Sequence, residues 1–146
     1  MLEIITYPNP ILTQPSQPIT NPTDLEIKQL VTEMTKTMRA HDGIGLAAPQ
    51  VGKNIRLFLV EIDHNLTVFI NPEIQKLSGK ETRMEEGCLS FPGQYLPIVR
   101  PSKVKIKFTD ASGQKQIIKA TGLLARAIQH EFDHLEGVLF TERANS

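Results

Sequence analysis

The sequence predicts an α+β fold in which mostly antiparallel strands pack around a C-terminal helix, with a second helix near the N-terminus. Two segments, one toward each end of the chain, repeat apolar residues at helical spacing. Between them lie short runs rich in β-branched and aromatic residues, separated by turn-forming residues. Because these strands are grouped and do not alternate with helices, antiparallel pairing is favoured.

The N-terminal segment is predicted to be extended, because prolines occur at positions 8, 10, 15, 18 and 22. A helix is then predicted over about residues 24–41. Thr23 followed by Glu26 has the spacing of a capping box, and Gly43 ends the pattern. Apolar residues follow the helical repeat in this range: Ile27, Leu30, Val31, Met34 and Met38.

The central part of the chain predicts the strands. "GIGLAAPQVG" predicts a loop with a short strand, and "IRLFLVEID" and "LTVFINPEI" predict a hairpin that turns at residues 63–65. "KVKIKFTD" alternates lysine with apolar residues, as a strand with one exposed face does. "QKQIIKA" predicts its partner after the turn "DASGQ".

A second helix is predicted over about residues 122–136, capped by Thr121 and ended by Gly137. Successive residues of a helix are rotated by about 100°, which sorts its side chains into two faces. The face predicted to be buried carries Leu123, Ala127, His130, Glu131 and His134. The face predicted to meet solvent carries Ala125, Gln129, Asp133 and Glu136.

The buried face of this helix predicts a metal site. His130 and His134 lie one turn apart, so both imidazoles can reach one metal ion. Glu131, between them, is poorly placed as a third ligand but can reach a water bound to the metal. A partly buried carboxylate has a raised proton affinity, which suits a general base.

The third ligand is predicted to be Cys88, the single cysteine, in "MEEGCLSFPG". A thiolate binds zinc or iron strongly, whereas His41 and His64 lie in a predicted loop and turn. Two alternatives remain for Cys88: a small buried apolar side chain, or a nucleophile with a histidine base. A helical pair of histidines with a glutamate between them fits metal binding better.

The loop "GIGLAAPQ" predicts a site for an extended peptide. Gly43 and Gly45 have no side chains, so another backbone can approach and add a strand. The amide of Gln50 could donate a hydrogen bond to a developing oxyanion.

Composition predicts one domain over residues 1–146 and excludes several classes of partner. Sixteen Lys and Arg residues balance sixteen Asp and Glu residues, so we expect no nucleic acid and no membrane partner, although a local patch is compatible with this balance. A lone cysteine, no membrane-spanning apolar run and no N-terminal leader pattern predict a cytoplasmic protein.

Three blocks, "GIGLAAPQ", "EGCLS" and "HEFDH", stand in the order typical of the peptide deformylase family, and the sequence resembles that family over nearly all 146 residues. The resemblance implies hydrolysis of the N-formyl group of N-formylmethionyl nascent peptides, with release of formate. It also implies that Cys88, His130 and His134 hold a metal, usually Fe(II), with zinc, nickel or cobalt able to occupy the site.

The resemblance further implies roles for the surrounding residues. Glu131 would act as general base toward a metal-bound water that serves as nucleophile, and then as general acid. The side chain of Gln50 and the backbone N–H of Leu89 would bind the oxyanion. Residues expected to border the substrate or its methionine side chain are Gly43, Ile44, Gly45, Leu123 and Ala127.

Further expectations concern two residues of the second helix and the end of the chain. Arg126 is expected to point away from the pocket, and Asp133 to be an exposed acid, with a buttressing pair between Asp133 and Arg100 as a hypothesis. The chain ends soon after the second helix, where many bacterial relatives continue into a helix that in some contributes to ribosome docking, so direct ribosome association is not expected.

Two rival functions share part of this pattern. A general metallopeptidase would usually take its third ligand from a downstream Glu or His. After Gly137 the sequence contains no His, and its single Glu is Glu142. A non-catalytic peptide-binding module would be expected to lack one of the metal-site residues, and none is missing.

Overall fold

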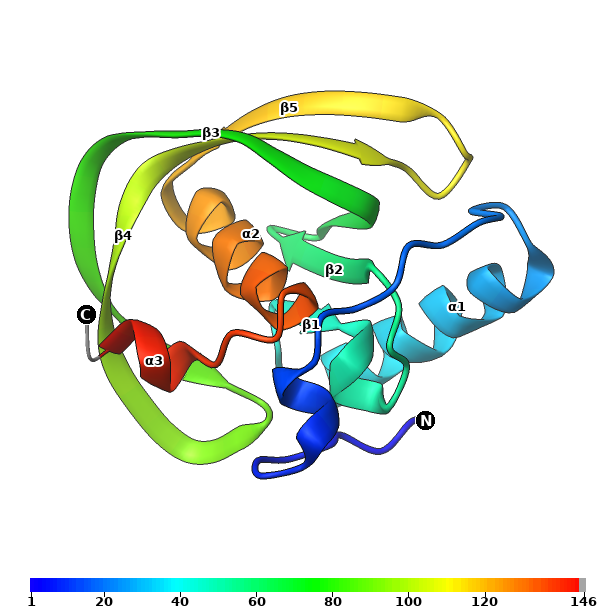
Figure 1. Cartoon of the computed structure of the whole chain (residues 1–146), viewed down its shortest axis with the longest axis horizontal. Coiled ribbons are helices and arrows are strands. Elements are labelled where there is room, and N and C mark those ends of the chain that lie inside the picture. The colour runs from blue at the N-terminus through cyan, green and yellow to red at the C-terminus, as the bar shows by residue number, and fades with distance from the viewer. Residues whose placement is uncertain (145–146) are drawn as a thin grey trace.

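A curved antiparallel sheet wraps around a central helix in the computed structural model, which describes residues 1–144 (Figure 1). The strands follow one another across the sheet in chain order: β1 (Gly45–Ala47), β2 (Leu57–Ile62), β3 (Asn65–Cys88), β4 (Phe91–Thr109) and β5 (Lys115–Thr121). The helices are α1 (Leu25–Ala40), α2 (Gly122–Leu135) and α3 (Phe140–Ala144), with 3-10 turns η1 (Pro10–Thr13) and η2 (Ala48–Val51). The predicted α+β class and antiparallel pairing are confirmed.

The predicted hairpin at residues 63–65 is confirmed and joins β2 to β3. Ile62 pairs with Asn65, and the two residues between them, Asp63 and His64, have φ of 52° and 65°. A two-residue turn with both φ values positive matches the twist of the flanking strands, and Asp and His tolerate that region better than most residues.

The long ribbon formed by β3 and β4 is the main element that the sequence did not predict. Its register shifts between Ile70 and Glu73, between Ile74 and Lys76, and again before Glu81. Such irregularities bend and twist paired strands, and here the ribbon curves around α2 (Figure 1). Residues 79–85 are exposed, so that stretch lacks the apolar alternation by which strands are recognised.

Helix α1 lies close to its predicted bounds, but the predicted capping box is wrong. The N-cap is Asp24, one residue after Thr23, and its backbone carbonyl accepts from Ile27 N at 3.0 Å. Met34 and Met38 are fully buried and belong to a cluster with Leu46, Leu57 and Leu59. This cluster supports β1, which borders the site described below.

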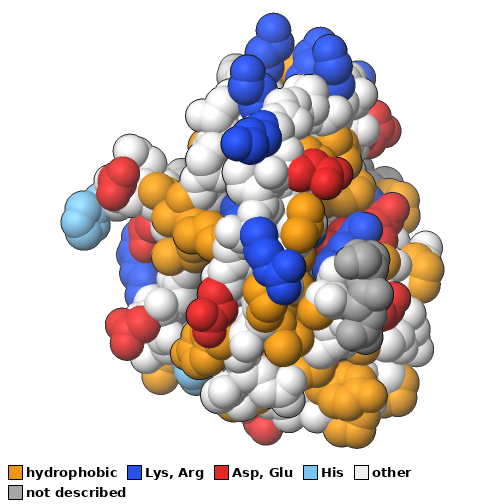
Figure 2. Space-filling view, turned by 90° about the vertical axis from the view of Figure 1, so that its left-hand side faces the viewer, with side chains coloured by type: hydrophobic (Ala, Val, Ile, Leu, Met, Phe, Trp, Pro, Cys, Tyr) orange, Lys and Arg blue, Asp and Glu red, His pale blue; other side chains and the backbone are white. Residues whose placement is uncertain are grey.

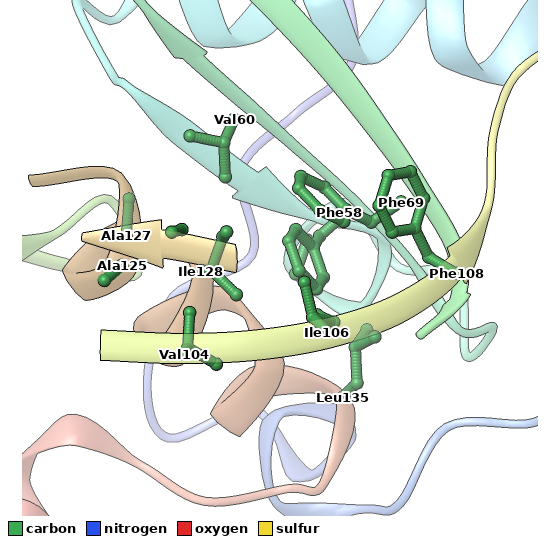
Figure 3. Packing of buried hydrophobic residues seen from close by; sticks show 12 residues of the cluster. Phe58, Val60, Phe69, Val104, Ile106, Phe108, Ala125, Ala127, Ile128 and Leu135 are labelled. Atoms are coloured by element: carbon green, nitrogen blue, oxygen red, sulfur yellow. The ribbon is translucent and has the colours of Figure 1, made fainter. Parts of the chain in front are cut away.

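Helix α2 occupies the core and is buried on nearly all sides. Phe58, Phe69 and Phe108 from three strands pack near Ile128 and Leu135 of the helix (Figure 3). The predicted solvent face is wrong for Ala125, Gln129 and Asp133, which are all buried, and the predicted buried face is wrong for Leu123, which is 44% exposed. The helical repeat assumes one covered face, whereas here the sheet and ribbon surround the helix.

The N-terminal segment is extended over most of its length, as predicted, and runs along the molecule as a strap. Ser16 N and Oγ both donate to the carbonyl of Leu135 at 2.8 Å, which satisfies an acceptor at the end of α2. Ile5 N donates to Gln50 O at 2.6 Å, and Tyr7 N donates to Ser90 O at 2.9 Å. The strap therefore joins the end of α2 to η2 and to the β3–β4 turn.

Glycine is required where the strap meets the end of α2. Gly137 has a φ of 72°, and a Cβ added there would lie 2.7 Å from the carbonyl atoms of Thr13. The predicted helix stop thus also permits close backbone contact. Within residues 1–144, no helix has the length and apolar character needed to cross a membrane.

Candidate metal centre

Three side chains that the sequence predicted as ligands converge on one point. Sγ of Cys88 and ring nitrogens of His130 and His134 all lie within 4.8 Å of one another. Sγ of Cys88 is 3.3 Å from Nε2 of His134. Cys88 is the last residue of β3 and the histidines lie on α2, so the curvature of the ribbon over the helix creates this cluster.

The orientation of His130 is set by Glu86. Nδ1 of His130 lies 2.8 Å from Oε1 of Glu86, which leaves Nε2 for an ion. Nδ1 of His134 is buried and has no hydrogen-bond partner in the part of the chain that the structure describes. One thiolate and two imidazoles with room for a fourth ligand suit a catalytic Zn²⁺ or Fe²⁺.

The two histidines differ in proton affinity. Burial opposes protonation of His130, but contacts with Cys88 and Glu86 outweigh it and raise its pKa to about 10. Burial, together with the charge on His130, lowers the pKa of His134 well below its ordinary value. A metal ion competes with protons for these nitrogens, so ion binding at His130 has to release one.

Glu86 is the centre of a buried ionic network that sequence reasoning missed. Its carboxylate accepts from Arg100 Nε at 2.7 Å and Nη2 at 3.0 Å, and from Arg126 Nη1 at 2.5 Å. Burial raises the pKa of Glu86, but His130 and Arg100 outweigh burial and lower it to about 2. The signal was present: Glu86 lies two residues before Cys88, a spacing that places both side chains on one face of a strand.

The expectations for Asp133 and Arg126 need correction. Asp133 is buried, and the hypothesised pair is present: Arg100 Nη1 donates to its Oδ2 at 3.0 Å. Arg143 of α3 also binds this carboxylate, at 2.8 and 3.0 Å. Arg126 does not point away; it lines the cavity and also donates to Thr82 O at 2.8 Å. Both residues lie under the ribbon, which the helical repeat could not reveal.

Glu131 has the environment expected of a general base. It is 5% exposed, and its Oε1 has no hydrogen-bond partner among residues 1–144. Burial is the largest cause that raises its pKa, to about 7. A Cβ at Gly45 would lie 2.5 Å from Oε2 of Glu131, so the carboxylate occupies space that only glycine leaves.

The amide of Gln50 is held in a fixed orientation. Its Oε1 accepts from Ala47 N at 2.9 Å, while its Nε2 donates to Ser90 Oγ at 3.1 Å and faces Cys88 Sγ at 3.6 Å. Ser90 in turn donates to Ile5 O at 2.7 Å. The donor end of Gln50 therefore points to the cluster, and Ser90 is a second contributor that the sequence did not single out.

A cavity of about 950 Å³ opens onto this cluster. Gly43, Ile44 and Gly45 form one wall, and Leu89 lies beside Cys88 in the lining. Leu123 and Ala127, expected to border the substrate, are also among its lining residues. Strand β1 is the first in the sheet, so one of its edges is unpaired within the described chain and can accept an extended peptide.

Comparisons with known proteins agree with this arrangement. The family model "Polypeptide deformylase" matches residues 1–146. A peptide deformylase of Treponema pallidum (strain Nichols) is 41% identical over 142 residues, covering 97% of this chain and 87% of the relative. One from Prochlorococcus marinus (strain MIT 9312) is 46% identical over 150 residues, covering 99% and 74%.

Solved structures show the same similarity. A peptide deformylase from Synechococcus elongatus in complex with actinonin has a TM-score of 0.96 and 43% identity, covering 99% of this chain and 79% of that one. The peptide deformylase from Thermotoga maritima has a TM-score of 0.95 and 38% identity, covering 98% and 97%.

Proposed function

The chain belongs to the polypeptide deformylase family of enzymes, and we propose that it hydrolyses the formyl group of N-formylmethionyl nascent peptides and releases formate. The observation that carries this proposal is the convergence of Cys88, His130 and His134 beside the buried carboxylate of Glu131. The cavity that opens onto them gives a peptide access.

Cys88, His130 and His134 would hold the metal ion on which the family depends. Family resemblance favours Fe²⁺, and Zn²⁺, Ni²⁺ or Co²⁺ can also occupy a site with these donors. When bound, the ion supplies Lewis acidity, which lowers the pKa of water and polarises a carbonyl. A thiolate ligand requires a reduced cysteine, so we place the reaction in the cytoplasm.

Gly45 of β1 and the two residues before it would receive the substrate backbone. An extended peptide can hydrogen-bond to the free edge at Gly43, Ile44 and Gly45. The apolar side chains of Ile44, Leu123 and Ala127 offer a surface for the methionine side chain. This placement directs the formyl group toward Cys88 and Glu131.

Glu131 would carry the proton transfers. Its raised pKa favours removing a proton from the attacking water and returning it to the departing amine. Gln50 Nε2 and the N–H of Leu89 would stabilise the negative charge that develops on the formyl oxygen. The contact from Ala47 N to Gln50 Oε1 keeps the donating end of that amide toward the site.

The site draws on β1, η2, β3 and α2, which supports the proposal that residues 1–146 form a single catalytic domain. The metallopeptidase alternative is disfavoured because Glu142 lies in α3, where its Oε1 accepts from Leu139 N at 3.2 Å. That contact engages Glu142 within the α3 region. The third residue of the cluster with His130 and His134 is Cys88 and not Glu142.

Formate release under anaerobic conditions tests the proposal. Freshly purified protein loaded with iron, zinc or nickel is assayed on formyl-Met-Ala-Ser, with the unformylated peptide as control. We expect formate from the first peptide and no cleavage of the second. Cleavage of the unformylated peptide without formate release would instead support a metallopeptidase, and inactivity with every metal would refute the proposed reaction.

A further inference from the structure

Six lysines share one side of the sheet, which we call the outer sheet face. In β4, Val104, Ile106 and Phe108 point into the core, so the alternating residues point outward. Paired residues of neighbouring antiparallel strands lie on the same side. The register therefore places these residues on the outer sheet face: Lys76, Lys103, Lys105, Lys107, Lys115 and Lys119.

Three of these lysines form a row across three strands. Lys76 of β3 pairs with Lys105 of β4, and Lys105 pairs with Lys119 of β5. Neighbouring strands lie about 4.8 Å apart, and like charges directly opposite each other destabilise a sheet. No ion pair within residues 1–144 involves any of the six lysines, and Glu73, opposite Lys107, is the one acid among their register partners.

Protection of a sheet edge does not account for this arrangement. Lysines on an edge strand prevent unwanted pairing, which would explain Lys115 and Lys119 on β5. Strand β4 lies between β3 and β5, so its three lysines protect no edge. In a chain of zero net charge, the outer sheet face gathers positive charge on one side. Lys and Arg side chains collect at the top of Figure 2, the end at which Figure 1 places β5.

The composition of the face indicates which anion it fits. Ile117 is the large apolar side chain exposed on this face, which leaves little apolar surface to insert into a membrane. No aromatic residue appears among the outward register partners, so nucleic-acid bases have nothing to stack on. Closely spaced lysines without aromatic residues can bind a row of phosphates, and such contacts do not depend on the base sequence. The expectation from net charge alone that nucleic acid is no partner overlooked this clustering.

We propose that the outer sheet face binds the phosphate backbone of structured RNA. The choice of RNA over other polyanions rests on the proposed function, because nascent peptides emerge from a ribonucleoprotein. None of the six lysines lines the 950 Å³ cavity. RNA and a formylated peptide can therefore be bound together. Association with the ribosome, which the end of the chain did not lead us to expect, would then come from the outer sheet face.

Fluorescence anisotropy with a labelled 20-base-pair RNA duplex tests this inference. The metal-loaded protein is compared with a triple variant of the row, Lys76→Gln, Lys105→Gln and Lys119→Gln. A matched control replaces three exposed lysines elsewhere, Lys28→Gln, Lys36→Gln and Lys53→Gln, and so changes net charge equally. Titrations run from 50 to 200 mM KCl, and anionic phosphatidylglycerol vesicles are tested in parallel.

We expect the row variant to bind RNA at least tenfold more weakly at 50 mM KCl. The slope of log K against log salt should become shallower by about 0.9 for each phosphate that is no longer neutralised. The control variant should weaken binding less than threefold. Because the row variant also removes like-charge repulsion, its Tm at low salt should equal or exceed that of the original protein, which excludes unfolding as the cause.

Three results would overturn the inference: no RNA binding by the original protein at 50 mM KCl, equal weakening in the two variants, or binding to vesicles but not to RNA. Formate release is measured on every sample. RNA binding that depends on the row in a protein without deformylase activity would retain the phosphate site and reject the proposed function. Deformylase activity without RNA binding would support the proposed function and reject the phosphate site.

Discussion

Oε1 of Glu86 lies 2.8 Å from Nδ1 of His130, and the same carboxylate is held by two buried arginines. Glu86 lines the cavity but is not among the three clustered candidate ligands. It nevertheless determines which nitrogen of His130 faces Cys88, and it links the candidate ligands to the ribbon that covers them. Changing this one carboxylate should therefore affect both the metal and the fold.

Glu86→Gln should weaken metal binding about 10- to 100-fold, because the neutral amide no longer holds His130 in the ligating orientation as strongly. Competition with a chelator, read by metal content per chain, measures this. Glu81→Gln, at an exposed position on the same strand, serves as the control and should leave affinity unchanged. Equal affinity in the Glu86 variant would show that the carboxylate does not position the ligand.

The same carboxylate predicts a dependence of stability on pH. Its folded pKa of about 2 is below the ordinary 4.5, so its stabilising contribution is complete above pH 4.5 and is lost as the pH falls toward 2. Urea unfolding at several pH values should show this loss. Glu86→Gln should remove that slope and cost about 3 kcal/mol at neutral pH, since Arg100 and Arg126 lose a buried anionic partner.

Glu131→Gln should keep the metal and lose hydrolysis by a factor of about 10² to 10⁴. In the unaltered enzyme the carboxylate form is the base, so kcat/KM should rise with pH through its pKa. Burial outweighs the charges of His130 and Arg100 and raises that pKa to about 7, which places the rise near pH 7. Turnover of the variant near the normal rate would contradict the assignment of Glu131.

Cys88→Ser should reduce metal retention, because a hydroxyl is a far weaker ligand than a thiolate. Metal content after dialysis, together with a structure of the variant, measures the effect. Full occupancy with unchanged ligand geometry would count against Cys88 as a ligand. The same experiment addresses the nucleophile alternative, in which activity would be lost with the metal retained.

Gly45→Ala should lower kcat more than tenfold, because the new methyl group would displace the carboxylate of Glu131. Gly43→Ala is the matched control. Its Cβ would lie 3.1 Å from a terminal carbon of Leu89, and that flexible side chain can move aside. Metal content and Tm should be nearly unchanged in both. A similar loss in the two variants would indicate a general effect on peptide binding.

The fold class, the hairpin and the helix bounds could be predicted because they depend on local patterns: apolar periodicity, turn residues and glycine stops. The β3–β4 ribbon could not, since residues 79–85 are exposed and carry no alternation. That omission also explains the errors at Asp133 and Arg126. Helical position alone predicts an outward direction for both side chains, whereas the ribbon buries them.

Within the site, the three candidate ligands could be found because the spacing of His130 and His134 is local and Cys88 is the lone cysteine. Of the ionic network, the pair of Arg100 with Asp133 could be put forward only as a hypothesis, and the central role of Glu86 could not be predicted. Glu86, Arg100 and Asp133 come from two strands and a helix, and only the tertiary arrangement shows that one guanidinium bridges both carboxylates. Charged residues in a sequence give no sign of which of them will be buried together.

The strap at the start of the chain ties the Gln50 and Ser90 side of the site to the N-terminal residues. Ile5 and Tyr7 hold the backbone of Gln50 and Ser90, and Ser90 donates back to Ile5. A protease that removed the first seven residues would leave Cys88, His130, His134 and Glu131 in place, but it would remove the contacts to Gln50 O and Ser90 O and the acceptor of Ser90 Oγ, which in turn accepts from Gln50 Nε2. Damaged copies would then lose turnover before they lose their metal, so metal content would overstate the amount of working enzyme in an aged preparation.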